Sequence, residues 1–209
     1  MANINWDYPE PREGIAGSYD RLIGPGATRA EIYLQFAFAA AAGVAMPAYA
    51  ILNHLGWSTI QLFVATAFAI DLTGGICTNA TSSAKRWYHQ QGMEFRQHFA
   101  FVAIHIHPLI VAWLFRSMDW TFFVVVYGYL LAATAIILRT ELYLRRPVAF
   151  ILFSGGILIN GYLFTPTHGL EWFVPFFYLK LLMGHILREE PYRPEGEKIC
   201  PHMPSGEHS

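Results

Sequence analysis

The chain has 209 residues, of which 54% are hydrophobic and only 14% are charged, whereas a typical soluble domain is about 25% charged. The formal net charge of −1 provides no basic field for nucleic acid, and two cysteines do not make the framework of a disulfide-rich secreted protein. Together with a mean hydropathy of +0.31, this composition indicates an all-α integral membrane protein.

Residues 1–30 come before the first long apolar run and are polar and rich in proline and glycine. They lack the apolar core of a cleavable signal peptide. We therefore expect a cytoplasmic N-terminal segment followed by insertion through the first membrane span.

Six apolar segments follow, each close to the roughly 20 residues that cross a bilayer as a helix. They cover approximately residues 31–53, 57–78, 97–115, 120–138, 147–164 and 170–187. Short connections make consecutive helices antiparallel neighbours, so the sequence predicts a six-transmembrane-helix bundle over residues 31–187. The longest connection, residues 79–96, is expected to be a loop, and residues 188–209 to be a cytoplasmic C-terminal tail.

The basic residues predict the orientation of these spans. Twelve of the fourteen Lys and Arg residues come before the first span or follow the second, fourth and sixth spans. Of the other two, Arg116 would lie on the opposite side and Lys180 within a span. Because basic loops stay cytoplasmic, we expect both termini inside and a multi-pass protein of the inner cell membrane.

Two spans each contain an ionisable group that a bilayer disfavours. Asp71 lies in the second span and Lys180 in the sixth, and a charge near the bilayer centre costs about 2.5–3.5 kcal/mol on insertion scales. The two residues could form a buried ion pair that fixes the spans together. Alternatively, Asp71 could act as a ligand, a base or a substrate anchor. Gly75 shares the helix face of Asp71, which allows close helix approach or leaves room for a ligand.

The third span contains three histidines. His98 and His105 are seven residues apart and share a helix face, whereas His107 is turned about 200° from His105 in a regular helix. We therefore expect His107 to face another helix and to form no joint site with His105. Pro108 has no backbone N–H, so it frees the carbonyl of residue 104 and permits a break in the helix.

The predicted orientation places the polar residues of several spans at one depth. The inner half of the bilayer or its edge would contain Asp71, Asn79, His98, His105, Glu141, Lys180 and His185. The basic, aromatic stretch over residues 85–89 would lie beside them and contact anionic headgroups. We therefore predict a polar cavity open to the cytoplasmic leaflet, with substrate-binding residues Asn79, Lys85, Arg86 and Glu141.

The leading functional hypothesis is a membrane-embedded enzyme that acts on a lipid or a lipophilic, isoprenoid-like substrate. Asp71, His98 and His105, with His185 in reserve, could hold a divalent metal such as zinc or iron and activate a water molecule. Lys180 would neutralise a developing oxyanion. Without a metal, Asp71 and His105 could act as an acid–base pair. The predicted catalytic residues are therefore Asp71, His105 and Lys180.

Three other functions are compatible with the sequence. A b-type haem or quinone subunit of an electron-transfer complex would need two facing histidines, for which His105 and His185 are the candidates. A small proton-coupled transporter could use Asp71 and Lys180, and an accessory subunit would pack against a larger membrane complex. The partners expected are membrane lipids, a lipophilic small molecule, and either partner membrane subunits or a second copy of the chain.

Overall fold

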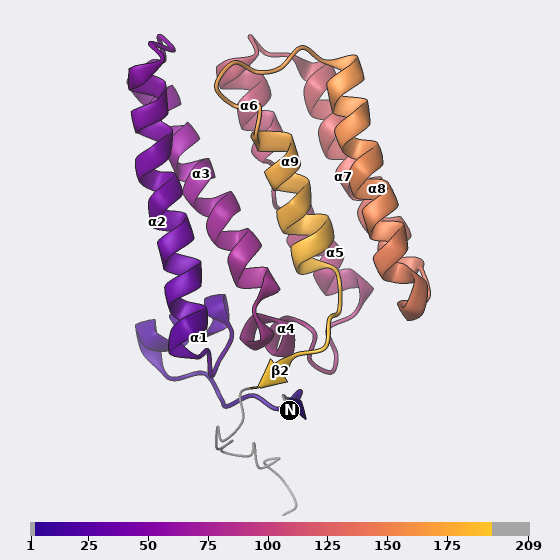
Figure 1. Ribbon diagram of the computed structural model, residues 1–209. Helices are drawn as coiled ribbons and strands as arrows, with labels where there is room; N and C mark the ends of the chain where they lie inside the picture. Colours follow the sequence, from indigo (N-terminus) through magenta and orange to yellow (C-terminus); the bar gives the residue numbers. More distant parts are fainter. Residues whose placement is uncertain (1–2, 194–209) are drawn as a thin grey trace, which may run out of the picture.

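The computed structural model describes residues 3–193, which fold mainly into helices (Figure 1). The helices are α1 (Gly14–Ile23), α2 (Arg29–Leu52), α3 (Thr59–Ala80), α4 (Ser82–Tyr88), α5 (Phe95–Ala103), α6 (His107–Phe115), α7 (Trp120–Arg139), α8 (Leu142–Leu163), α9 (Phe173–Tyr178) and a π-helix, η1 (Leu179–His185). Two short strands, β1 (Asn3–Ile4) and β2 (Tyr192–Arg193), pair antiparallel. Most of the predicted tail over residues 188–209 lies outside the described residues.

Within residues 3–193, five helical stretches are long and apolar enough to cross a membrane. They are α2, α3, α5 with α6, α7 and α8. Large apolar side chains such as Tyr33, Phe63, Phe150 and Tyr162 are exposed along them, as expected of surfaces that face lipid. The chain is therefore a helical membrane protein. The segment 170–187 is not among the five, because α9 and η1 together cover only residues 173–185.

The short rod made by α9 and η1 is nevertheless the centre of the bundle. It lies between α3 on one side and α7 and α8 on the other (Figure 1). Phe177, Leu181 and Leu182 are completely buried. The buried Tyr178 hydroxyl donates to the carbonyl of Val126 on α7 at 2.9 Å. The last apolar segment is thus the core element around which the longer helices pack.

The long helices begin where the sequence supplies capping residues. Thr28 and Glu31 form a reciprocal capping box at the start of α2, and Ser58 and Gln61 form one at the start of α3. The carboxylate of Asp119 accepts the backbone N–H of Phe122 at 3.0 Å at the start of α7. Each cap satisfies backbone donors that the first turn of a helix leaves without partners.

The connection expected to be a loop contains α4, so that prediction is wrong for residues 82–88. Thr81 caps this helix, and the side chain of Glu31 accepts the backbone N–H of Ser83 at 3.0 Å. Gly24, with φ of +88°, allows the chain before α2 to approach so closely that a Cβ atom would lie 2.2 Å from Ser83. These contacts join α1, α2 and α4 into one layer. We call the end of the bundle that carries α1, α4 and the β1–β2 pair the basic end.

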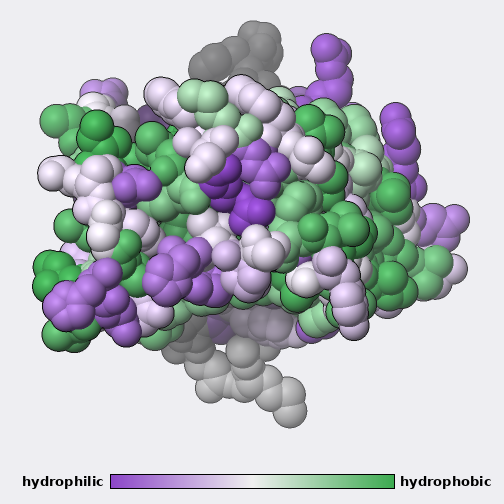
Figure 2. Space-filling view, turned by 90° about the horizontal axis from the view of Figure 1, so that it is seen from above, coloured by the Kyte–Doolittle hydropathy of each residue, from purple (hydrophilic) through white to green (hydrophobic). Residues whose placement is uncertain are grey.

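The opposite end of the bundle is closed by a polar contact between loops. Figure 2 looks onto this end, where hydrophilic side chains gather near the middle and hydrophobic ones occupy much of the rim. Arg116 donates to the Asp119 carboxylate, to the Thr165 carbonyl and to the Thr167 hydroxyl. The loop after α6 is thereby held to the loop before α9.

Candidate functional site

The third apolar segment is interrupted between α5 and α6, at residues 104–106. Pro108 cannot donate to the carbonyl of Ile104, which instead accepts the N–H of Ile106 at 3.0 Å. The carbonyls before it also have substitute partners. Phe101 O accepts His105 Nδ1 at 2.7 Å, Val102 O accepts the His105 N–H at 3.0 Å, and Ala103 O accepts the Tyr127 hydroxyl at 2.5 Å. The backbone carbonyls of residues 101–104 therefore have hydrogen-bond partners at the break, as backbone at membrane depth requires.

The break brings two histidines together, which corrects the expectation that His107 faces elsewhere. The rings of His105 and His107 are stacked, with centroids 5.4 Å apart and planes 15° apart. In a regular helix, a turn of 100° per residue would separate the faces of His105 and His107. Residues 104–106 are not helical, so that separation does not hold here. His107 also contacts the rings of Phe68 and Phe177, at 4.7 and 5.6 Å.

Asp71, halfway along α3, accepts two donors on one oxygen. Lys180 Nζ lies 2.6 Å from Asp71 Oδ2, and His107 Nε2 lies 3.2 Å from the same atom. Gly75, one turn after Asp71, provides the space for the lysine, because a Cβ atom there would lie 2.4 Å from Lys180 Cε. The ion pair considered from the sequence is therefore present, and the glycine makes room for its cation. We call Asp71, His105, His107 and Lys180 the mid-bundle cluster.

The two sides of the ion pair differ in exposure. The side chain of Lys180 is 5% exposed and that of His107 is 18% exposed, whereas that of Asp71 is 45% exposed. Asp71 Oδ1 accepts no hydrogen bond from the residues that the structure describes. Ile70, which precedes Asp71 in α3, is also exposed, and so is Ile104 at the helix break. The carboxylate can thus be reached from the side of the bundle.

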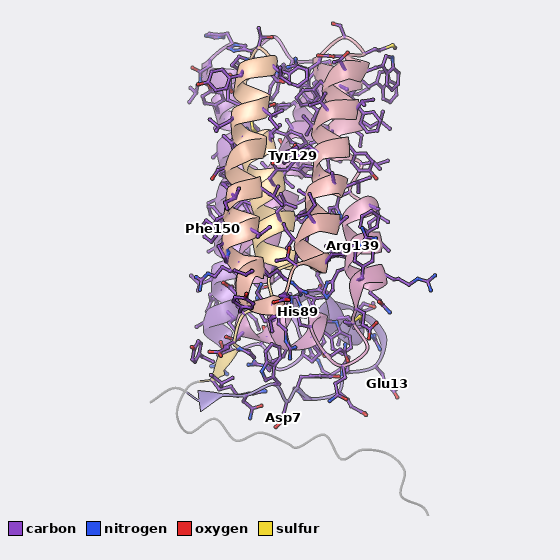
Figure 3. The ribbon with its side chains drawn as sticks, turned by 90° about the vertical axis from the view of Figure 1, so that its right-hand side faces the viewer. Asp7, Glu13, His89, Tyr129, Arg139 and Phe150 are labelled. Atoms are coloured by element: carbon purple, nitrogen blue, oxygen red, sulfur yellow. The ribbon has the colours of Figure 1, made fainter. Side chains whose placement is uncertain are left out.

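A second cluster lies at the basic end and consists of Lys85, His89, His98 and His185. His98 Nδ1 lies 3.2 Å from His185 Nε2, and the rings of His89 and His98 are 4.7 Å apart. His89 Nε2 donates to the carbonyl of His185 at 3.0 Å. In Figure 3, His89 lies below Arg139, the last residue of α7, and therefore closer to the basic end. We call these four residues the basic-end cluster.

Two residues of the basic-end cluster, Lys85 and His89, hydrogen-bond to backbone carbonyls at the C-terminal end of η1. Lys85 Nζ donates to the carbonyls of Gly184 and Leu187, both at 2.6 Å, and lies 3.8 Å from Glu189. Burial lowers the pKa of Lys85 to about 8. Burial, helped by His98 and Lys85, holds the pKa of His89 far below its ordinary value of 6.5. His89 is therefore neutral at physiological pH, which suits its role as a donor to a backbone carbonyl.

The phenyl ring of Phe101 contacts histidines of both clusters. Its centroid is 3.9 Å from that of His185 and 4.8 Å from that of His105. A haem iron bound by these two histidines would have to lie where Phe101 packs. The geometry therefore gives the expected His105–His185 haem pair no support.

The predicted metal ligands divide between the two clusters. Asp71 and His105 belong to the mid-bundle cluster, and His98 and His185 belong to the basic-end cluster. Among residues 3–193, no group of three or more His, Cys, Asp or Glu side chains is arranged to share a metal ion. A zinc or iron site on these residues remains a prediction that would require rearrangement of one cluster.

The four predicted substrate-binding residues occupy separate places. Asn79 is buried, with Nδ2 3.5 Å from the carbonyl of Lys180. Lys85 and Arg86 are buried in α4. Glu141 is exposed at the start of α8 and has no side-chain capping bond. The structure does not bring these four residues together around one cavity.

Regular helical spacing does not predict the place of His107 in the mid-bundle cluster. The signal for it is Pro108, because a proline that interrupts backbone hydrogen bonding also changes the faces of the residues before it. The Tyr127 hydroxyl, which donates to the carbonyl of Ala103 at the break, has no comparable signal in the sequence.

No family model, curated protein or solved structure matches this chain. A function is therefore inferred from the geometry and chemistry of the residues described above.

Proposed function

We propose that this protein crosses the inner cell membrane six times and has both termini in the cytoplasm. The sixth span would be α9 and η1 with their flanking residues, 170–187, which extend through the centre of the bundle (Figure 1). The concentration of basic residues on the side of α4 and the start of α8 supports a cytoplasmic basic end.

Within that membrane arrangement, we propose that the protein is an enzyme that transfers protons to and from a lipophilic, isoprenoid-like substrate. One observation carries this proposal. Asp71 has one oxygen held by Lys180 and His107, while its other oxygen has no described donor and the side chain as a whole is 45% exposed. An ionisable group within a membrane span is a functional candidate by default, because its burial is costly.

Each residue would have a distinct role in proton transfer. Asp71 Oδ1 would accept a proton from the substrate and return it at another atom, so that no oxidant or second substrate is needed. The Lys180 ammonium would stabilise negative charge on the substrate during the transfer. His107, held against Phe68 and Phe177, would keep the carboxylate in position. His105 stacks on His107 and would fix the orientation of that ring.

Entry of the substrate from the lipid phase follows from the exposure of Asp71. A substrate that reaches the carboxylate from the side of the bundle must dissolve in the bilayer and carry a polar group. A lipid or isoprenoid with a hydroxyl or carbonyl group has both properties. We therefore favour the metal-free form of the enzyme hypothesis, for which the required groups are already in contact.

The proposal is tested by identifying lipophilic molecules that purify with the protein. Wild-type, Asp71→Asn and Glu13→Gln proteins would be purified in mild detergent, extracted with organic solvent and analysed by mass spectrometry. Glu13 is an exposed residue before α1 whose side chain makes no capping bond, so Glu13→Gln is the control. We expect a lipophilic compound with a polar group to be retained by the wild type and by Glu13→Gln, but reduced at least tenfold in Asp71→Asn. Circular dichroism would verify that the Asp71 variant is folded. Equal retention in all three proteins would contradict the proposal.

A second candidate function, proton-coupled transport, is favoured by one further observation. The rings of five histidines form a spatial row that leads from Asp71 to the basic end. Phe101 is the only other ring in this row, between the histidines of the two clusters. Chains of acidic residues and histidines are typical of proton relays. Proton movement into proteoliposomes that depends on an added solute, and that is lost in Asp71→Asn, would favour this function over the enzyme.

A further inference from the structure

A cavity of about 540 Å³ at the basic end has a strongly basic lining. It lies between the end of α3, the start of α8 and the chain after η1. Its charged lining residues are Lys85, Arg145, Arg146, Arg188, Glu189 and Glu190. An adjacent cavity of about 410 Å³ shares Arg145 and Arg188 with it. Neither cavity includes a residue of the mid-bundle cluster.

The arginines of this cavity retain most of their capacity to bind an anion. Arg146 has no hydrogen-bond or ion-pair partner among the described residues. The Arg188 guanidinium packs over the ring of Trp6 at 4.4 Å, which leaves its hydrogen-bond donors available. Arg145 uses Nε and one terminal nitrogen for the carbonyls of Leu138 and Thr140. Two arginines can therefore donate to a ligand while the third adds positive charge.

The acidic residues offset only part of the positive charge of the cavity, because two carboxylates stand against four basic side chains. Glu189 lies 3.8 Å from Lys85 and Glu190 accepts the hydroxyl of Tyr192 at 3.2 Å, so neither pairs with an arginine. The start of α8 also lines the cavity, and Glu141 does not cap it with its side chain. The partial positive charge of that helix terminus therefore adds to the charge of the arginines.

The surroundings of the cavity indicate an anion that belongs to a lipid. Leu142 and Tyr143 line it and are themselves exposed at the start of a membrane-spanning helix. The positive-inside rule accounts for basic residues at this end, but it requires no cavity among them. We propose that this cavity binds a phosphate ester, with Arg146 and Arg188 donating to its oxygens. Guanidinium groups match phosphate geometry better than other cations do.

This binding site goes beyond the proton-transfer site, and neither proposal depends on the other. It would be tested on the full-length protein in an uncharged detergent, with native mass spectrometry used to count bound lipids. The probes are dioctanoyl phosphatidic acid, dioctanoyl phosphatidylcholine and inorganic phosphate. The variants are Arg146→Gln, Arg146→Gln with Arg188→Gln, and Arg29→Gln as a control at the start of α2, outside the cavity.

We expect one phosphatidic acid per chain, bound at least tenfold more weakly by the double variant and less than twofold more weakly by Arg29→Gln. Arg146→Gln alone should weaken binding about threefold to tenfold, and because Arg146 has no described partner its removal should leave the fold intact. If inorganic phosphate displaces the lipid, the ligand is a soluble phosphate compound; if it does not, the ligand is a lipid headgroup. Equal binding by wild type and double variant, or equally tight phosphatidylcholine, would overturn the proposal.

Discussion

Removal of the Lys180 ammonium should reveal how much the mid-bundle ion pair stabilises the fold. In Lys180→Met, the Asp71 carboxylate keeps only His107 at 3.2 Å. Removing one partner of a buried ion pair costs about 3–5 kcal/mol, because the remaining charge has no compensation. We expect about 2 kcal/mol for Lys180→Met, because His107 remains and the Asp71 side chain is 45% exposed. Asp71→Asn should cost about 4 kcal/mol, because the lysine side chain is only 5% exposed and donates to Asp71 alone.

The double variant separates the cost of leaving one ion without its partner from the cost of lost packing. With both charges gone, neither ion is left without a partner, so Asp71→Asn with Lys180→Met should cost less than the sum of the single changes by about 3 kcal/mol or more. The free energy of unfolding would be measured by titration with SDS in mixed micelles, followed by circular dichroism. Additivity of the two changes to within about 0.5 kcal/mol would refute the reasoning.

Three further outcomes follow from the structure. Gly75→Ala should displace Lys180, whose Cε lies where the new Cβ must go, and should reduce the Asp71–Lys180 coupling energy below about 1 kcal/mol, whereas Gly128→Ala, which has open space around it, should not. Lys85→Met should lower the free energy of unfolding by about 2 kcal/mol in the same SDS titration, because it leaves the carbonyls of Gly184 and Leu187 without their donor. The Arg12 side chain holds the pKa of Asp20 below its ordinary value of 3.8, so the stability that Asp20 contributes is complete above that pH and is lost as the pH falls through the lower, folded-state pKa. Limited proteolysis of the α1 region should therefore accelerate in acid in the wild type and be independent of pH in Asp20→Asn.

The apolar helices could be predicted from the sequence because span length and hydropathy are properties of single segments. Five of the predicted segments appear as candidate spans, and their ends are shifted by only a few residues. The seven-residue helix α4 could not be predicted in this way. It is short and polar, and it is stabilised by contacts with Glu31 and Ile23, which are distant in the sequence.

The candidate site was partly predictable for a related reason. Asp71 and Lys180 are conspicuous because their charge conflicts with the surrounding segment, and opposite charges at similar depth favour pairing. The position of His107 depends on the helix break at Pro108, where the Tyr127 hydroxyl and the His105 ring hydrogen-bond to carbonyls of α5. Regular helical geometry contains neither of these contacts, so it placed His107 on the wrong face.

The most direct test of the central claim is whether Asp71 transfers protons to a lipid. Purified protein would be incubated in D₂O with a total membrane lipid extract, and each lipid class would be examined by mass spectrometry for incorporated deuterium. We predict that one class gains deuterium with wild-type protein and with Glu13→Gln, but not with Asp71→Asn. Equal incorporation by wild type and Asp71→Asn, or none in any lipid class, would contradict the account.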